Sequence, residues 1–341
     1  MIATSPKVHD FVPSPIPAFN LERKANTSDL GSFLYSVVIP VYQSEKTIDE
    51  VIVRTAELFK KLDLKYEIIA VDDGSTDQSR EVITKCADAN KNVTAISLVK
   101  NYGQQSAILC GLNYSKGDYV INLDDDLQNP PEEVEKLITM AVRGYDLVCG
   151  VYPQKKHPLF RRLGSMLINR VNERIFGKPK DFRLTNFRIM NRSLVERICN
   201  YRTAYPYVNG LAMLLSGKRA NVLVNHQERL QGRSTYTFAK ILNLVAAILL
   251  NYSSFPLRFF CFCGLIVSIA SFLFGAIVFF RELLGYSKVL GWTSLVLLLS
   301  FYNGFLILML GLVGEYTMRI LNTIAIPQSF NVLDVYKRDE A

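Results

Sequence analysis

Residues 121–133 read INLDDDLQNPPEE, and this stretch decides how the rest of the chain is interpreted. An apolar run from Tyr119 to Leu123 delivers three carboxylates at its end, and a helix start with two prolines and two glutamates follows. Proline is tolerated in the first turn of a helix, and acids there favour the positive end of the helix dipole. The pattern therefore predicts a buried strand with acids at its carboxyl end, where open α/β sheets bind their ligands.

Two of these acids, Asp124 and Asp126, alternate along the strand and are expected to point to one side of it. Converging carboxylates repel each other unless a cation joins them. A hard divalent ion, held partly by substrate phosphates, suits such a place. We expect Mg²⁺ or Mn²⁺ there, with Asp124 and Asp126 as its ligands. A solvated acidic turn is the alternative, because Asp-x-Asp alone is a short motif.

Short strands alternate with helices on both sides of this stretch, which predicts an α/β fold with a mostly parallel sheet covered on both faces. The expected strands are residues 35–42, 66–73, 93–99, 118–124 and 146–151. The expected helices are residues 46–61, about 78–89, 103–115 and 131–143.

Polar residues recur where the predicted strands end. They are Tyr42, Glu45, Asp72, Asp73, Asn101, Gln104, Asp124 and Asp126. Each group alone is more often a turn or a helix cap, as Ser75 and Thr76 illustrate. Together they favour a nucleotide crevice. The chain has no G-x-G-x-x-G motif and no P-loop, so a metal and side chains are expected to meet the phosphates.

The composition limits the choice of partners. A net charge of +8 suits nucleic acid, anionic lipid or phosphorylated substrates. No zinc-finger or aromatic-basic RNA-binding pattern is present, so nucleic acid is disfavoured. The six cysteines lack zinc spacing and indicate reduced thiols that face the cytosol. Residues 1–34 are expected to form a tail without a signal peptide, because proline and charge replace an apolar core.

The second half of the chain points to a membrane. Residues 152–180 are strongly basic with apolar residues near helical spacing, which indicates an amphipathic helix that either lies on anionic lipid or is simply solvated. Residues 237–256 predict a helix at the membrane interface. The uncharged runs 259–280 and 291–314 each pass the ~20 residues needed to span hydrocarbon, so a two-helix hairpin over 257–320 is expected. Buried soluble helices are the alternative.

Basic residues lie on both outer sides of this expected hairpin, and only Arg281 and Lys288 lie in its loop. The positive-inside rule then predicts two spans with the catalytic domain and both termini in the cytoplasm. The expected organisation is a tail over 1–34, a catalytic domain over 35–236, the juxtamembrane helix, the hairpin, and a cytoplasmic tail over 321–341.

Four segments carry a resemblance to a known family: VIPVYQSE at 38–45, VDDGSTD at 71–77, KNYGQ at 100–104 and LDDDLQNPPE at 123–132. They resemble the motifs of family 2 glycosyltransferases with the GT-A fold. The chain is most similar to the polyprenyl-phosphate glycosyltransferases, the group that includes dolichyl-phosphate mannose synthase, bactoprenol glucosyltransferases and undecaprenyl-phosphate aminoarabinose transferase. The resemblance covers about residues 35 to 325, and GLVGEYTMRI at 311–320 resembles the second-span ending of the aminoarabinose branch.

The resemblance implies roles for individual residues. It implies that Asp73, with Asp72 beside it, contacts the nucleotide base and that Pro40 and Glu45 border it. Asp124 and Asp126 are implied to hold the diphosphate through the metal. The family usually has a small residue where Asp125 stands, so the ligand set stays open between these acids. The further residues placed along the nucleotide and phosphate site are Tyr42, Asn101, Gln104, Asp125 and Gln128.

On the acceptor side, TNFRIMNR at 185–192 resembles a family motif whose arginine, here Arg188, lies near the site. An acid commonly precedes it as a candidate base, and Asp181 is the nearest match, although its offset from Arg188 is about one residue longer than in the aminoarabinose branch. Arg229, Gly232, Ser234 and Tyr236 match an Arg-x-x-Gly-x-Ser-x-Tyr loop that is suited to phosphate, with a surface turn as the alternative.

The implied activity is inverting transfer of a sugar from a nucleotide sugar, UDP-linked in the bacterial relatives, to a membrane polyprenyl phosphate such as undecaprenyl phosphate. The product would serve cell-envelope glycan modification, and the family implies a tetramer. A processive polysaccharide synthase is disfavoured, because those enzymes usually carry a Gln-x-x-Arg-Trp motif and the only tryptophan here is Trp292. A catalytically idle scaffold that binds nucleotide sugar or lipid is the alternative from another class.

Overall fold

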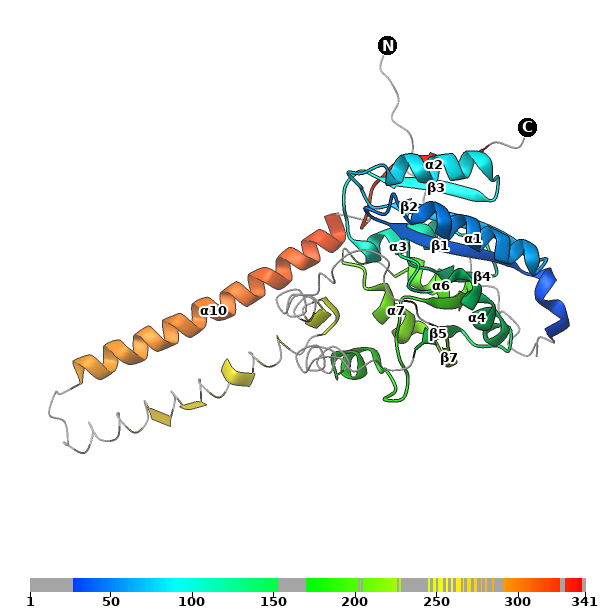
Figure 1. Ribbon diagram of the computed structural model, residues 1–341. Helices are drawn as coiled ribbons and strands as arrows, with labels where there is room; N and C mark the ends of the chain where they lie inside the picture. Colours follow the sequence, from blue (N-terminus) through cyan, green and yellow to red (C-terminus); the bar gives the residue numbers. More distant parts are fainter. Residues whose placement is uncertain are drawn as a thin grey trace, which may run out of the picture.

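A computed structural model describes residues 27–152, 170–201, 203, 205–225, 227, 291–325 and 329–338, together with scattered positions between 245 and 284. Its centre is an eight-stranded mixed sheet in the order β7-β5-β6-β4-β1-β2-β3-β8 (Figure 1). The strands are β1 (Leu34–Val41), β2 (Lys65–Asp72), β3 (Val93–Leu98), β4 (Tyr119–Asn122), β5 (Leu147–Val151), β6 (Arg188–Asn191), β7 (Arg219–Leu223) and β8 (Val332–Tyr336).

The α/β prediction is confirmed for the first half of the chain. All five expected strands form, and β4, β1, β2 and β3 pair in parallel. Antiparallel β6 lies between β4 and β5, and the sequence did not indicate it. Parallel β7 beyond β5, and antiparallel β8 beyond β3, extend the two edges of the sheet. The acid-bearing β4 is therefore an inner strand with a neighbour on each side.

Helices cover both faces of the sheet. The first face carries α1 (Ile48–Lys61), α2 (Ser79–Ala89) and α4 (Val134–Ala141), the last directly after the short 3-10 helix η2 (Pro131–Glu133). The second face carries α3 (Gln104–Tyr114), α6 (Arg192–Cys199) and α7 (Val208–Leu215). The helices expected over 103–115 and 131–143 are confirmed with slightly shorter bounds.

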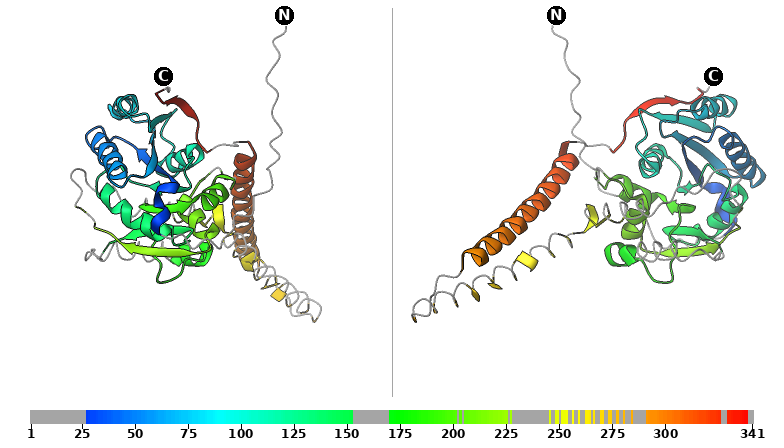
Figure 2. Two further views of the ribbon diagram at one scale, coloured as in Figure 1. Left: turned by 90° about the vertical axis from the view of Figure 1, so that its right-hand side faces the viewer. Right: turned by 60° about the vertical axis from the view of Figure 1, so that its left-hand side comes forward.

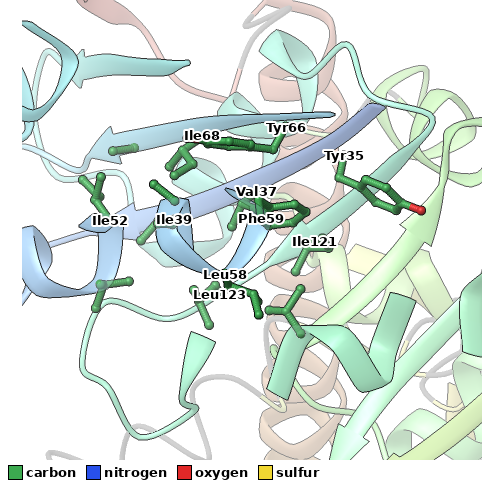
Figure 3. Packing of buried hydrophobic residues seen from close by; sticks show 14 of the residues in the cluster. Tyr35, Val37, Ile39, Ile52, Leu58, Phe59, Tyr66, Ile68, Ile121 and Leu123 are labelled. Atoms are coloured by element: carbon green, nitrogen blue, oxygen red, sulfur yellow. The ribbon is translucent and has the colours of Figure 1, made fainter. Parts of the chain in front are cut away.

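The helix α1 shows why these residues form a covering layer. Acidic Asp49 and Glu50 lie in its first turn and basic Lys60 and Lys61 in its last, as the helix dipole favours. Its buried side chains recur at helical spacing, and Phe59 contacts the rings of Tyr35 and Tyr66. Figure 3 shows this cluster between α1 and the strands β1, β2 and β4. Burial of such apolar side chains is the main force that holds helix to sheet.

On the opposite face, α3 approaches β1 unusually closely at Gly111. A Cβ atom built at Gly111 would lie 2.3 Å from Cγ1 of Val38. Val38 is fully buried in β1, so its side chain has no free space to move into. Close packing of this kind makes a single added methyl group costly. The close approach matters for the site because α3 begins at Gln104, next to the acids.

We predict that Gly111→Ala lowers the free energy of unfolding by about 1–3 kcal/mol through this clash. Val38→Ala in the same chain should remove much of the penalty, so the double variant should be more stable than the two single losses together suggest. Thermal unfolding in detergent, followed by near-UV circular dichroism, measures this. Gly31→Ala is the control, because the nearest atom to its new Cβ lies 4.0 Å away. Simple additivity of the two changes would contradict the proposed contact.

One long apolar helix, α10 (Trp292–Ala325), extends away from the α/β body in all views (Figures 1 and 2). Its window Phe301–Met318 is long and apolar enough to cross a membrane, and none of that window is buried inside the protein. At 1.5 Å per residue, a helix of this length reaches about 50 Å, more than the ~30 Å of hydrocarbon. The described residues thus contain one candidate span. Half of the expected first span, 259–280, and most of the interfacial helix, 237–256, lie outside them.

After α10 the chain returns to the sheet. The strand β8 lies within the segment 321–341 and pairs antiparallel with β3. Tyr336 donates to Oδ1 of Asp88 at 2.5 Å, and Arg338 donates to the carbonyl oxygen of the same residue at 3.0 Å. An ion pair of 3.6 Å joins Arg80 of α2 to Asp334. The far edge of the sheet is thus built from the residues that follow α10.

Candidate functional site

The carboxyl end of β4 turns sharply and displays the three acids. Leu123 donates its backbone N–H to Val38, which extends the pairing with β1 by one residue. Leu127 then adopts a left-handed backbone with φ of 59°, and Gln128 donates its N–H to Oδ1 of Asp126 at 3.1 Å. The turn lets the chain leave the sheet and enter η2. Asp124, Asp125 and Asp126 are half-buried along this turn.

Asp124 is held by amide groups on both of its oxygens. Gln104 donates to Oδ1 at 3.0 Å, and Asn129 donates to Oδ2 at 3.4 Å. Burial, then repulsion from Asp126 and Asp125, raises the pKa of Asp124 to about 7, and Arg188 and Gln104 act in the opposite direction. Negative charge is therefore in excess at this point of the protein.

Asp125 serves a different purpose, because it is engaged with the loop after β1. Its Oδ2 accepts from the backbone N–H of Tyr42 at 3.1 Å and from the hydroxyl of Ser44. Its carbonyl oxygen accepts from Thr47 at 2.7 Å. Burial raises the pKa of Asp125, and the bonds from Ser44 and Tyr42 oppose that rise. This acid therefore joins the ends of β1 and β4.

Asp73, at the end of β2, is buried and accepts two backbone hydrogen bonds from the loop between β3 and α3. Tyr102 donates to one oxygen at 2.7 Å, and Gly103 donates to the other at 2.9 Å. Its neighbour Asp72 accepts from the N–H of Ser75 at 3.2 Å. Burial is the main cause that raises the pKa of both carboxyls. Asp73 thus positions the loop between β3 and α3. Contact of Asp73 with a nucleotide base stays a prediction.

Gly74 lets these two strand ends meet. Its φ is 66°, and a Cβ there would lie 2.6 Å from the carbonyl carbon of Lys100. Only glycine combines that backbone with so close an approach. The loops after β2 and β3 are therefore in direct contact beside Asp73.

The other residues expected along the nucleotide crevice lie around the same edge. Pro40 is buried in β1 opposite Val71 of β2. Glu45 accepts from the N–H of Gln78 at 3.1 Å, just before α2 begins. Tyr42 and Asn101 are exposed to solvent. The expected convergence of four strand ends on one edge is thus present.

Arg188, in contrast, is fully buried. It opens β6 and lies opposite Asn122 of β4 and Cys149 of β5. Its Nη1 donates to Oδ1 of Asn209. Among the residues that the structure describes, neither Nε nor Nη2 has a hydrogen-bond partner, and the same holds for both polar atoms of the Asn122 side chain. Burial lowers the pKa of Arg188, and Cys149 and Asp124 oppose that change. Direct contact of Arg188 with an acceptor phosphate stays a prediction.

Three residues near the acids escaped the sequence analysis. Asn186 and Asn209 form hydrogen bonds that link Arg188 to Gln104. Tyr152, directly after β5, has its pKa raised by burial and by the charges of Asp124 and Asp126. Asn186 lies inside the quoted 185–192 motif, so its position was a usable signal. For Asn209 and Tyr152, the sequence contained no such signal.

The remaining expected site residues lie at the margin or beyond the described chain. Asp181 is exposed in a turn before Phe182. The carbonyl oxygen of Gln128 accepts from Gln227 at 2.9 Å, so the segment that precedes the Arg-x-x-Gly-x-Ser-x-Tyr loop touches the acid turn. Arg229, Ser234 and Tyr236, and most of the basic stretch 152–180, lie outside the described residues.

The donor set at the turn fits a hard divalent ion. Asp124 and Asp126 offer carboxylate oxygens, and their repulsion would be relieved by a cation. Within the described ranges, no group of three or more His, Cys, Asp or Glu side chains converges as a metal cage. Two carboxylates that leave further positions to phosphate oxygens and water are the usual arrangement for Mg²⁺.

Comparison with known proteins agrees with this geometry. Residues 36–199 match the model of "Glycosyl transferase family 2". The undecaprenyl-phosphate 4-deoxy-4-formamido-L-arabinose transferase of Photorhabdus laumondii is 35% identical over 85% of this chain and 90% of the relative. The enzyme of the same name from Pectobacterium carotovorum is 37% identical over 84% of this chain and 88% of the relative. The chain belongs to glycosyltransferase family 2.

Solved structures support the fold of this family 2 protein. Glucosyl-3-phosphoglycerate synthase from Mycobacterium tuberculosis, in complex with Mn²⁺, UDP and phosphoglyceric acid, superimposes with a TM-score of 0.51. The alignment covers 69% of this chain and 83% of the other, at 20% sequence identity. The GT-A-like fold expected from the sequence is therefore confirmed, with a mostly parallel mixed sheet.

We predict that Asp124→Asn stabilises the metal-free glycosyltransferase at alkaline pH. An aspartate ionises near 4 in the unfolded chain and near 7 here, so the wild type loses stability as pH rises from about 4 to about 7. The variant should not lose stability in this way. Above pH 7, its free energy of unfolding should exceed that of the wild type by an amount on the order of 1–2 kcal/mol. Unfolding in EDTA, measured across pH 4–8, tests this. A variant that is less stable at every pH would show that the amide contacts outweigh the repulsion.

Proposed function

We propose that this protein is an inverting glycosyltransferase that moves a sugar from a nucleotide sugar to a polyprenyl phosphate at a membrane. The observation that carries the proposal is the pair Asp124 and Asp126 after β4, inside the matched family 2 domain, with Gln104 and Asn129 donating to Asp124. Relatives at 35–37% identity are named for transfer to undecaprenyl phosphate, and they align over most of both chains. UDP is the favoured nucleotide, since a structure of the same fold holds UDP with Mn²⁺.

The residues divide the work by position. Asp124 and Asp126 would hold a divalent ion, which as a Lewis acid neutralises the charge of the leaving diphosphate. The loops after β1, β2 and β3 form the edge where the nucleotide binds. Asp73 and Asp125 keep these loops in place through their backbone hydrogen bonds.

The reaction needs no strong base. An oxygen of the lipid phosphate attacks the anomeric carbon from the face opposite the diphosphate. The bond from that carbon to the diphosphate oxygen breaks, and the nucleoside diphosphate leaves with the electron pair. The second pKa of a phosphate monoester is about 6, so the attacking oxygen is already anionic at neutral pH. The acceptor must instead be held by cations, for which Arg229 is placed by the resemblance. Asp181, the acid that the resemblance offers as a base, is exposed in a turn.

Membrane attachment supplies the lipid substrate. The apolar helix α10 provides one candidate span, and the second span is proposed over 259–280. Catalytic domain and termini are proposed to face the cytoplasm, where nucleotide sugars are made, and a homo-oligomer is proposed from the resemblance. Since the relatives are named for 4-deoxy-4-formamido-L-arabinose, that sugar is the first donor to test.

We predict that Asp126→Asn reduces sugar transfer by at least about 100-fold while the protein stays folded, because the variant loses one of two charges that hold the metal. Purified protein in liposomes would receive undecaprenyl phosphate, Mn²⁺ or Mg²⁺, and radiolabelled UDP- and GDP-sugars, and the lipid fraction would be counted. Label should enter lipid from one donor and be lost with EDTA.

The control variant is Glu57→Gln, which removes an exposed carboxylate on α1 and should transfer at the wild-type rate. Unchanged turnover in Asp126→Asn would overturn the metal role of that residue. Nucleotide-sugar binding without any labelled lipid, across the whole panel, would favour a binding scaffold over an enzyme.

A further inference from the structure

Three side-chain amides form an unbroken chain from the buried Arg188 to Asp124. Arg188 donates to Oδ1 of Asn209. Asn209 donates to Oδ1 of Asn186 at 3.0 Å, Asn186 donates to Oε1 of Gln104 at 3.3 Å, and Gln104 donates to Oδ1 of Asp124 at 3.0 Å. We name Asn209, Asn186 and Gln104 the amide relay.

The chemistry of its two ends fixes the direction of every bond in the relay. A guanidinium can only donate, and an ionised carboxylate can only accept. An amide between them must present its oxygen to the arginine side and its N–H to the aspartate side. Turning over any one amide would place two acceptors or two donors face to face. The orientation of all three amides therefore follows from Arg188 and from the ionised form of Asp124.

The relay joins elements that are far apart in the sequence. Gln104 begins α3, Asn186 precedes β6, and Asn209 lies in the first turn of α7. Asn209 is anchored again through its backbone N–H, which donates to Gln105 at 3.4 Å. The next residues toward the start of α7 face the juxtamembrane segment, where the backbone N–H of Tyr207 donates to the hydroxyl of Tyr252 at 3.0 Å.

The buried charge gives the relay its strength. Arg188 has no exposed surface, and its remaining nitrogens Nε and Nη2 lack hydrogen-bond partners among the described residues. A buried guanidinium is costly unless its charge is compensated. Hydrogen bonds in series between opposite charges polarise one another and become stronger than isolated amide bonds. The side chain of Asp124 is consequently tied to a fully buried, rigid part of the sheet.

We propose that Asn186 and Asn209 are positioning residues that hold the carboxylate of Asp124 in the orientation needed to bind the metal and the donor diphosphate. The inference rests on the proposed function for the identity of that ligand. Neither residue is assigned to reach the substrate; each acts through Gln104 on Asp124. Residues behind metal ligands commonly change metal affinity about 10- to 100-fold when removed.

The experiment uses the full-length protein in detergent and measures the binding of Mn²⁺ in the presence of UDP, from the electron paramagnetic resonance signal of free Mn²⁺. Asn186→Ala is the main variant, because it leaves the bond between Arg188 and Asn209 intact and does not strand the buried charge. Its Mn²⁺ affinity should fall about 10-fold. The Mn²⁺ affinity of Asn209→Ala should fall by a similar factor. The double variant should bind Mn²⁺ no more weakly than the weaker-binding single variant, because one missing link already interrupts the relay.

A second comparison separates the effect of hydrogen-bond direction at Asn186 from the effect of its side-chain packing. Asn186→Asp keeps the size of the side chain but cannot donate to Gln104. If the relay positions Asp124, kcat for sugar transfer should fall further in Asn186→Asp than in Asn186→Ala. If Asn186 only fills space, the isosteric variant should be the milder one. Asn221→Ala is the matched control, because it removes three hydrogen bonds in β7 that do not touch the relay.

The outcomes are distinguishable from failure of the proposed function. Wild-type affinity for Mn²⁺ and UDP in Asn186→Ala, or an equal loss in Asn221→Ala, would overturn the relay. A wild-type protein that binds Mn²⁺ with UDP but labels no lipid would overturn the acceptor assignment, while the affinity comparison still decides on the relay. A wild-type protein that binds no Mn²⁺ would overturn the metal site and the role of the relay with it.

Discussion

Asp124 follows β4 with two further carboxylates directly behind it, and their mutual repulsion shapes the surroundings. Parallel strands place their carboxyl ends on one edge of the sheet. The loops that follow β1, β2 and β3 therefore lie at the same edge as these carboxylates. The protein responds with neutral donors. Amides of Gln104 and Asn129 reach Asp124, and a backbone N–H and a hydroxyl reach Asp125. The cation Arg188, whose charge opposes the raised pKa of Asp124, is fully buried. Neutral donors thus stabilise the edge without cancelling its negative charge.

The acids of this edge differ in function although they are neighbours in sequence. The carboxylate oxygens of Asp73 and Asp125 accept hydrogen bonds from the backbone of neighbouring loops. These bonds hold the loops in place. Among the described residues, Asp124 accepts from side chains, the amides of Gln104 and Asn129. The distinction explains how a run of three aspartates can serve both structure and chemistry.

Sequence reasoning succeeded where the signal is local. The apolar runs of β1 to β5 and the helices between them could be found because periodicity and turn residues mark them within a few residues. It failed for β6, β7 and β8, which are short and acquire their pairing from strands distant in the chain. The direction of Asp125 could not be predicted either, since its partners lie 78 to 83 residues away. Asn209 was invisible for the same reason, because the surrounding helix gives no hint that Arg188 lies beside it.

The position of β8 has a consequence for how the protein is made. The strand that closes the β3 edge is synthesised after α10, so the ribosome has already produced the long apolar helix before the sheet is complete. Until then β3 presents unpaired backbone groups, an arrangement that invites wrong pairing with other chains. If α10 enters the bilayer during synthesis, the sheet can be finished only beside the membrane. Completion of the catalytic domain would then be a late event of biogenesis, and a chain that failed to insert would keep an open edge by which quality control could recognise it.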